Sequence, residues 1–149
     1  IPPIPWHANG WYWVFALLTE CEKSENRKVL FAVSTAVQDI QGETKNAVFR
    51  RIGQTLFPEY YKQDSGTLTN RIRAQIESLT STYREHSKRL KVTRGGKGGN
   101  DESPMEQDVY LDGWYIPPTG PDQSNCEDAK NLWEQIELEF PPFPRLHAI

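Results

Sequence analysis

The apolar residues of the chain recur at steps of three and four in five stretches, the spacing of one face of an α-helix. The most regular stretch opens at Thr67 and is expected to run to about Lys91, or about 36 Å at the helical rise. Its apolar positions form a single stripe: Leu68, Ile72, Ile76, Leu79, Tyr83 and Leu90. The pattern therefore predicts one long helix that buries one side.

Three shorter patterns precede this helix. The opening Ile-Pro-Pro-Ile-Pro is expected to run extended into Trp6, because each proline lacks an amide donor and restricts its predecessor. A first helix is predicted to begin after Asn9–Gly10 and to close in the polar stretch 20–26. Its apolar face is Trp11, Val14, Phe15 and Leu18. The run 29–40 either forms a second helix or continues the first, and Gly42 suits its end.

Thr44 can cap a further helix that Pro58 stops. The apolar face of this helix is Ala47, Val48, Ile52 and Leu56. The segment 59–66 is predicted to be a loop that leads into the long helix.

The C-terminal part combines aromatic residues with prolines. Residues 109–116 are expected to be extended, and Ser124 is expected to cap a last helix. The apolar face of that helix is Ala129, Leu132, Trp133 and Ile136. The segment 140–147 is predicted to be a proline-stiffened strap that packs on the first helix near Trp11 and Trp13.

These elements predict an all-α protein organised in three parts. Residues 1–94 form a helical core with an extended N-terminal arm, and residues 95–108 a flexible, glycine-rich and acidic linker. Residues 109–149 form an aromatic segment and a helix packed on the core.

Composition fits one aromatic-weighted domain within 149 residues that include five Trp, six Tyr and six Phe. The longest apolar run, Trp11–Leu18, is far shorter than the roughly 20 residues that span a bilayer, so a soluble intracellular protein with no membrane partner is expected. Because the chain starts at Ile1 rather than Met, it is expected to be a piece of something longer.

No convergent catalytic or metal-binding set is found. Cys21 and Cys126 lack CxxC spacing and are expected to be idle thiols. The three histidines lie in separate segments: His7, His86 and His147. The glycines around Lys97 lack the Ser or Thr that a phosphate loop places after its lysine. A binding protein without enzymatic activity, cofactor or metal is predicted.

Charge is strongly segregated along the chain. Residues 1–70 are neutral, residues 71–99 carry eight basic against two acidic groups, and residues 100–149 carry two basic against eleven acidic groups. The pattern indicates a face that binds a polyanion beside an acidic region that screens or regulates it.

On the long helix, the inward stripe leaves basic residues on or beside the outward side: Arg73, Arg84, Lys88 and Lys91. Hydrogen-bonding side chains accompany them: Thr69, Asn70, Gln75, Thr80 and Ser87. A helix of this width fits the DNA major groove, where Arg reads guanine and Asn or Gln reads adenine. On composition alone, a solvated face that only keeps the protein soluble stays open.

The stretches Leu68–Leu79 and Tyr83–Leu90, after a Trp-rich first helix and a helix that ends at Pro58, resemble the Myb/SANT-like, or trihelix, domain. Over nearly the whole chain, it further resembles Myb/SANT-like proteins common in fungal genomes and often associated with transposable elements. That wider similarity rests on the stretches 91–96, 115–122, 131–136 and 140–147. The resemblance implies a three-helix core over about residues 9–94, here with an extra helical segment at 29–40.

The resemblance also implies DNA binding by the third helix of that core. The residues carried over are Asn70, Arg71, Arg73, Gln75, Arg84, Lys88 and Lys91, with Asn70 and Gln75 as base readers. A nuclear, chromatin-associated protein that regulates transcription, or one derived from a transposon, is expected.

Two alternatives stay open. A SANT-type interaction module would use the acidic residues 100–149 to hold a basic partner such as a histone tail. An oligomerisation domain would use an exposed patch of aromatics near Trp11, Trp114 and Phe143. Basic residues of the long helix without carboxylate partners would favour DNA, whereas linker acids would undercut it by neutralising them: Asp101, Glu102, Glu106 and Asp108.

Overall fold

The computed structural model describes residues 1–31, 44–91 and 110–149. Within these ranges 71% of the residues are helical and no strand occurs, which confirms the all-α class. The chain divides into two compact units, Ile1–Thr80 together with Ile149, and Ser81–Ala148. The predicted linker 95–108 lies outside the described residues, as does the predicted helical run 29–40 from residue 32 onward.

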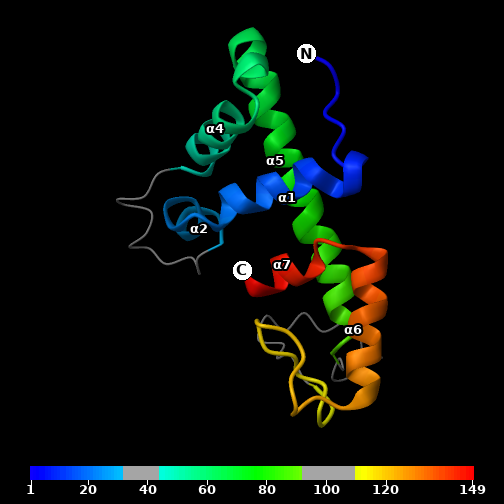
Figure 1. The fold of residues 1–149 in the computed structure, drawn as a ribbon. Coiled ribbons are helices and arrows are strands. Elements are labelled where there is room, and N and C mark those ends of the chain that lie inside the picture. The colour runs from blue at the N-terminus through cyan, green and yellow to red at the C-terminus, as the bar shows by residue number, and fades with distance from the viewer. Residues whose placement is uncertain (32–43, 92–109) are drawn as a thin grey trace, which may run out of the picture. The chain divides into compact units, whose positions relative to one another are not determined.

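The first unit contains α1 (Ala8–Glu22), α2 (Ser24–Leu30), α4 (Lys45–Leu56) and the residues up to Thr80 of α5 (Pro58–Lys88) (Figure 1). Its core is built from side chains that are almost inaccessible to solvent: Val14, Leu17, Leu18, Cys21, Val48, Ile52, Leu68 and Ile72. Gly53 lets α4 and α5 approach closely, since a Cβ there would lie 3.1 Å from the Leu68 side chain.

The N-terminal helix starts with a left-handed turn. Asn9, Gly10 and Trp11 all have positive φ angles, so regular right-handed helix begins at Tyr12, close to the predicted start. The predicted polar end is only partly correct: α1 stops at Glu22, but α2 follows directly from Ser24 and uses part of that polar stretch.

Of the predictions for the start of α4 and for the segment that follows it, the first is confirmed and the second is wrong. Thr44 caps α4 as expected, its hydroxyl accepting a hydrogen bond of 3.1 Å from the Ala47 amide. The predicted loop 59–66 is wrong, because α5 is helical from Pro58 onward and interrupted only at Asp64. Proline is compatible with a helix start, where no amide donor is required.

Asp64 caps the long part of α5. Its carboxylate accepts hydrogen bonds from the amide and the hydroxyl of Thr67, at 3.1 and 2.7 Å. These bonds stabilise the charged form and lower the pKa of Asp64. The predicted stripe is confirmed by burial of Leu68, Ile72, Ile76, Leu79 and Leu90 and half-burial of Tyr83, although α5 ends at Lys88 and not at Lys91.

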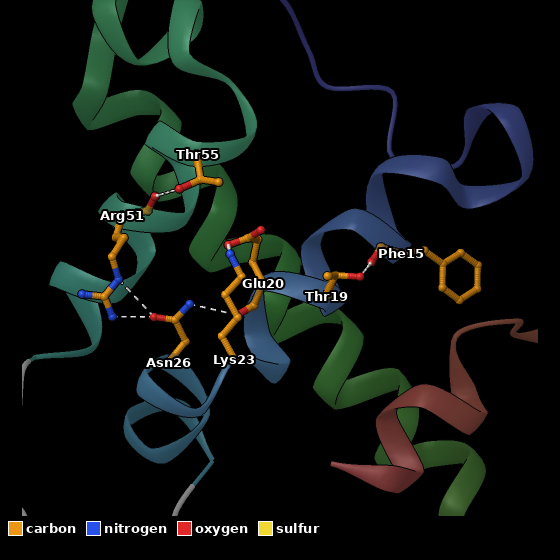
Figure 2. Close-up of polar contacts among 7 residues, drawn as sticks. All are labelled: Phe15, Thr19, Glu20, Lys23, Asn26, Arg51 and Thr55. Atoms are coloured by element: carbon orange, nitrogen blue, oxygen red, sulfur yellow. Dashed lines mark hydrogen bonds and ion pairs between the residues drawn. The ribbon is translucent and has the colours of Figure 1, made fainter.

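A buried asparagine joins three helices of the first unit (Figure 2). Asn26, only 2% exposed, donates from Nδ2 to the Glu20 carbonyl at the end of α1, over 2.8 Å. Its Oδ1 accepts two hydrogen bonds from the Arg51 guanidinium of α4, that from Nε at 3.1 Å. Lys23 adds an ion pair with the Glu20 carboxylate at 3.0 Å. One side chain of α2 thus fixes the end of α1 against α4.

Replacing Asn26 by Ala is expected to lower the free energy of unfolding by about 2 kcal/mol, because the buried hydrogen bonds of its side chain to the Glu20 carbonyl and the Arg51 guanidinium are lost. Asn131→Ala, at an exposed helical position, serves as the control and should change stability by less than about 0.5 kcal/mol. Urea unfolding followed by circular dichroism measures both. Equal effects of the two substitutions would contradict a role of Asn26 in joining the helices.

The second unit contains the end of α5, α6 (Glu127–Glu139) and α7 (Phe143–Ala148). The predicted apolar face of α6 is confirmed, with Ala129, Trp133 and Ile136 buried and Leu132 half-buried. The predicted Ser124 cap is wrong: α6 starts after Cys126, and the Ser124 hydroxyl donates to Asp122 at 2.6 Å. A short side chain that closes a local turn competes with helix capping in this way.

The predicted strap 140–147 is a short helix at its end, because Pro144 occupies the first turn of α7, where its missing amide costs nothing. The rings of the tail contact Tyr83, His86 and Trp133 of their own unit. The expected packing of the tail on Trp11 and Trp13 of the first unit stays a prediction. Phe143 is fully buried and stacks on Tyr83 with 5.0 Å between ring centroids.

The segment between residue 110 and α6 is non-helical, as predicted, but it turns rather than running straight. The Trp114 amide donates to the Leu111 carbonyl at 2.9 Å, and Gly113 takes a positive φ of 82°. Asn125, 6% exposed, donates to the carbonyls of Gly113 and Tyr115 at 3.1 and 2.6 Å. The loop is therefore held by hydrogen bonds from one buried side chain.

Candidate nucleic-acid interface

Arg84 and Lys88 form the centre of the candidate interface in the second unit. They are one helical turn apart on α5, which places them on the same face, and both are exposed. Within the described residues neither side chain has a hydrogen bond or an ion pair. The stretch 81–91 carries four basic residues against Glu85 alone, so its net charge is positive.

Lys91 and Arg89 differ from this pair. Lys91 lies beyond the end of α5 and is half-buried. Arg89 donates from Nη1 to Glu139 of α6 at 2.8 Å and to His86 Nδ1 at 3.1 Å. The pKa of Glu139 is lowered, mainly by a hydrogen bond from Gln135 and next by the one from Arg89. The carboxylate therefore stays ionised and offsets the Arg89 charge.

The remaining candidates belong to the first unit. Asn70 and Arg73 are exposed on successive turns, and Arg73 donates to Asn70 Oδ1 at 3.2 Å. Arg71 is half-buried and donates to the Pro2 carbonyl, which holds the N-terminal arm. Gln75 is half-buried as well. Two predicted residues, Asn70 and Arg73, therefore present their polar groups together, whereas Arg71 serves the fold.

The acidic residues that could neutralise the basic face lie outside the described residues: Asp101, Glu102, Glu106 and Asp108. The acidic residue near α5 that the sequence did not single out is Glu139, which reaches Arg89 and lies 3.9 Å from His86 Nδ1. It engages neither Arg84 nor Lys88.

A hydrogen-bonded histidine positions the end of α5 in the second unit. His147 Nε2 lies 2.9 Å from the Ile116 carbonyl, which can only accept, so Nε2 carries a proton. In the neutral ring Nδ1 then accepts from the Tyr83 hydroxyl at 2.9 Å. His147 thus links α7, α5 and the loop, a role that the sequence did not reveal because these residues are far apart.

The three aromatics suggested for an oligomeric contact differ in exposure. Phe143 is fully buried and cannot contribute to a surface, whereas Trp11 and Trp114 are half-buried. The prediction that Phe143 belongs to an exposed aromatic patch is therefore wrong.

The cysteines are free, with Cys21 buried in the first unit and Cys126 half-buried in the second. Burial, together with the nearby charges of Glu22 and Glu20, raises the pKa of Cys21 to about 12. In residues 1–31, 44–91 and 110–149 no group of three or more His, Cys, Asp or Glu side chains is placed to hold a metal ion.

Comparison with family models, with curated protein sequences and with solved structures finds no match to this chain. None of the helices in the described ranges combines the length and the apolar character needed to cross a membrane.

Since a thiol with a raised pKa is not ionised at pH 8, Cys21 should resist an aromatic disulfide reagent in the folded protein. One thiol per chain is expected to react in native buffer and two in guanidinium chloride, measured by absorbance. In Cys126→Ser the native protein should show no fast-reacting thiol. A fast reaction in that variant would contradict the burial of Cys21.

Proposed function

We propose that this chain is a DNA-binding module of the Myb/SANT-like kind, with α5 as its DNA-contacting helix and a nuclear, chromatin-associated role. The observation that carries the proposal is the exposed pair Arg84 and Lys88, one turn apart and without an acidic partner in the described part of the chain. Basic side chains kept free in this way are available for phosphate groups, which attract them strongly.

The division of labour on α5 follows from side-chain chemistry. Arg84 and Lys88 contact phosphates and supply affinity without reading sequence. Asn70 and Arg73, whose side chains are hydrogen-bonded to each other, are the candidates for reading base edges, since Arg binds guanine and Asn binds adenine in the major groove. Gln75 and Lys91 are secondary because each is half-buried.

The double variant Arg84→Ala, Lys88→Ala is expected to weaken binding to a mixed-sequence DNA duplex and to make it less salt-dependent. Each lost phosphate contact reduces the slope of log K against log salt by about 0.9, so the slope should fall by about 2. Fluorescence anisotropy at several salt concentrations measures both quantities.

The matched control is Lys28→Ala, Arg50→Ala, which removes two exposed basic residues of the first unit outside α5. It should leave the slope unchanged within error. If both double variants lower affinity equally, only net charge matters and α5 is not the contact. Absence of duplex binding by the unmodified chain at low salt would refute the proposed function.

A second candidate function is a SANT-type module that binds a basic protein segment, and the outward face of α6 favours it. Glu127, Glu134 and Leu138 follow at steps of seven and four and therefore share one side of the helix. All three are exposed, and Leu138 is 80% exposed. Acidic groups around an exposed apolar side chain suit a lysine-rich peptide with an apolar residue.

For this candidate, Glu127→Gln with Glu134→Gln should weaken binding of a histone-tail-like basic peptide several-fold, since two attractive charges are lost. Glu25→Gln with Glu59→Gln removes two exposed acids of the first unit and serves as the control. Isothermal titration calorimetry measures both. No peptide binding by the unmodified chain, together with salt-sensitive DNA binding, would leave only the first function.

A further inference from the structure

A small hollow lies in the second unit where the chain leaves α5. It has a volume of about 90 Å³ and is lined by Arg89, Leu90, Lys91, Leu111 and Trp114. One side of the hollow is formed by two turns at the end of α5. The Leu90 amide donates to the Ser87 carbonyl at 3.0 Å, and the Lys91 amide donates to the Lys88 carbonyl at 3.1 Å. The turn from Leu111 to Trp114 forms the other side.

The lining of the hollow combines apolar and cationic groups. Leu90 is buried, whereas Trp114 is half-buried and Leu111 is 57% exposed, so an aromatic ring and an apolar rim remain accessible. Both hydrogen bonds of Arg89 use Nη1, which leaves donors on Nη2 and Nε. The ion pair with Glu139 already restricts the Arg89 side chain. A ligand that binds the guanidinium therefore causes little further loss of side-chain entropy.

Further aromatic surface follows directly in the sequence. Tyr115 is 54% exposed and packs edge-on against Tyr110 at 5.2 Å between ring centroids. Aromatic rings next to basic side chains are the chemistry that proteins use for single nucleic-acid strands, in which bases stack and phosphates pair with cations.

We propose that the hollow binds one unpaired nucleobase, stacked on Trp114, while the Arg89 guanidinium holds the adjoining phosphate. The proposal rests on the proposed DNA-binding function and extends it: the module that contacts a duplex through Arg84 and Lys88 also prefers DNA with an unpaired end or a displaced base. An acidic peptide could use the cations but would leave the ring of Trp114 without a flat partner, so the nucleobase is favoured.

The test compares binding of two duplexes of equal length, one blunt and one with an overhang of three thymidines. The unmodified chain should bind the overhang duplex roughly ten-fold more tightly, the effect expected for stacking one base. Trp114→Ala should abolish this difference and leave blunt-duplex binding unchanged, whereas Trp114→Phe should retain most of it.

Leu111→Asp provides a second variant, at an exposed position where the fold tolerates a polar side chain, and its charge should repel the phosphate and remove the overhang preference. Tyr12→Ala, which truncates an exposed aromatic (59%) in the first unit, is the control and should keep the preference. Circular dichroism verifies the fold of each variant.

An equal affinity of the unmodified chain for both duplexes, or a preference that survives both Trp114→Ala and Leu111→Asp, would overturn the inference. Displacement of the overhang by a polyglutamate peptide at equal concentration would also overturn it, in favour of an acidic protein ligand. Salt-sensitive duplex binding without overhang preference refutes the hollow alone. Trp114-dependent binding of a thymidine oligonucleotide without duplex binding refutes only the proposed function.

Discussion

The burial of one side of α5 is the constraint on which the rest of the structure depends. Leu68 and Ile72 are fully buried in the first unit, and Tyr83 of the same helix is half-buried in the second. Burying a Leu or Ile side chain is worth about 1.5–3 kcal/mol, far more than an exposed charge pair contributes. The apolar stripe therefore decides which side of α5 faces water, and Arg84 and Lys88 are exposed as a consequence.

Much of the fold could be predicted because it follows from local rules. The steps between Leu68 and Leu79 revealed the buried side of α5, and Thr44 revealed the start of α4. The helical segment after Pro58 and the helix α7 were missed because prolines were taken to exclude helix, although a first-turn proline is allowed. Proline marks a helix boundary without saying on which side the helix lies.

The candidate interface was predictable only where one helix carries it. Arg73, Arg84 and Lys88 are exposed, as the spacing on α5 indicated. The engagement of Arg71 by Pro2, and of Arg89 by Glu139, depends on contacts between distant parts of the chain. Asn26 illustrates the same limit. It is a polar residue in a polar stretch, and nothing in that pattern indicates that it is buried and accepts a hydrogen bond from Arg51. Hydrogen-bond partners that are far apart in sequence leave no periodic pattern.

The position of His147 has a consequence for the order in which the chain can fold during synthesis. Its partner Tyr83 precedes it by 64 positions. At about 5–20 residues per second, a ribosome needs several seconds to add those residues. During that time Tyr83 is already part of the chain, whereas Phe143 and His147, whose rings pack against it, have not yet been added. The first unit, which is complete by Thr80 apart from Ile149, can meanwhile collapse by itself. The nascent protein is therefore expected to be most vulnerable to aggregation and to proteases around Tyr83 until Phe143 and His147 have been made.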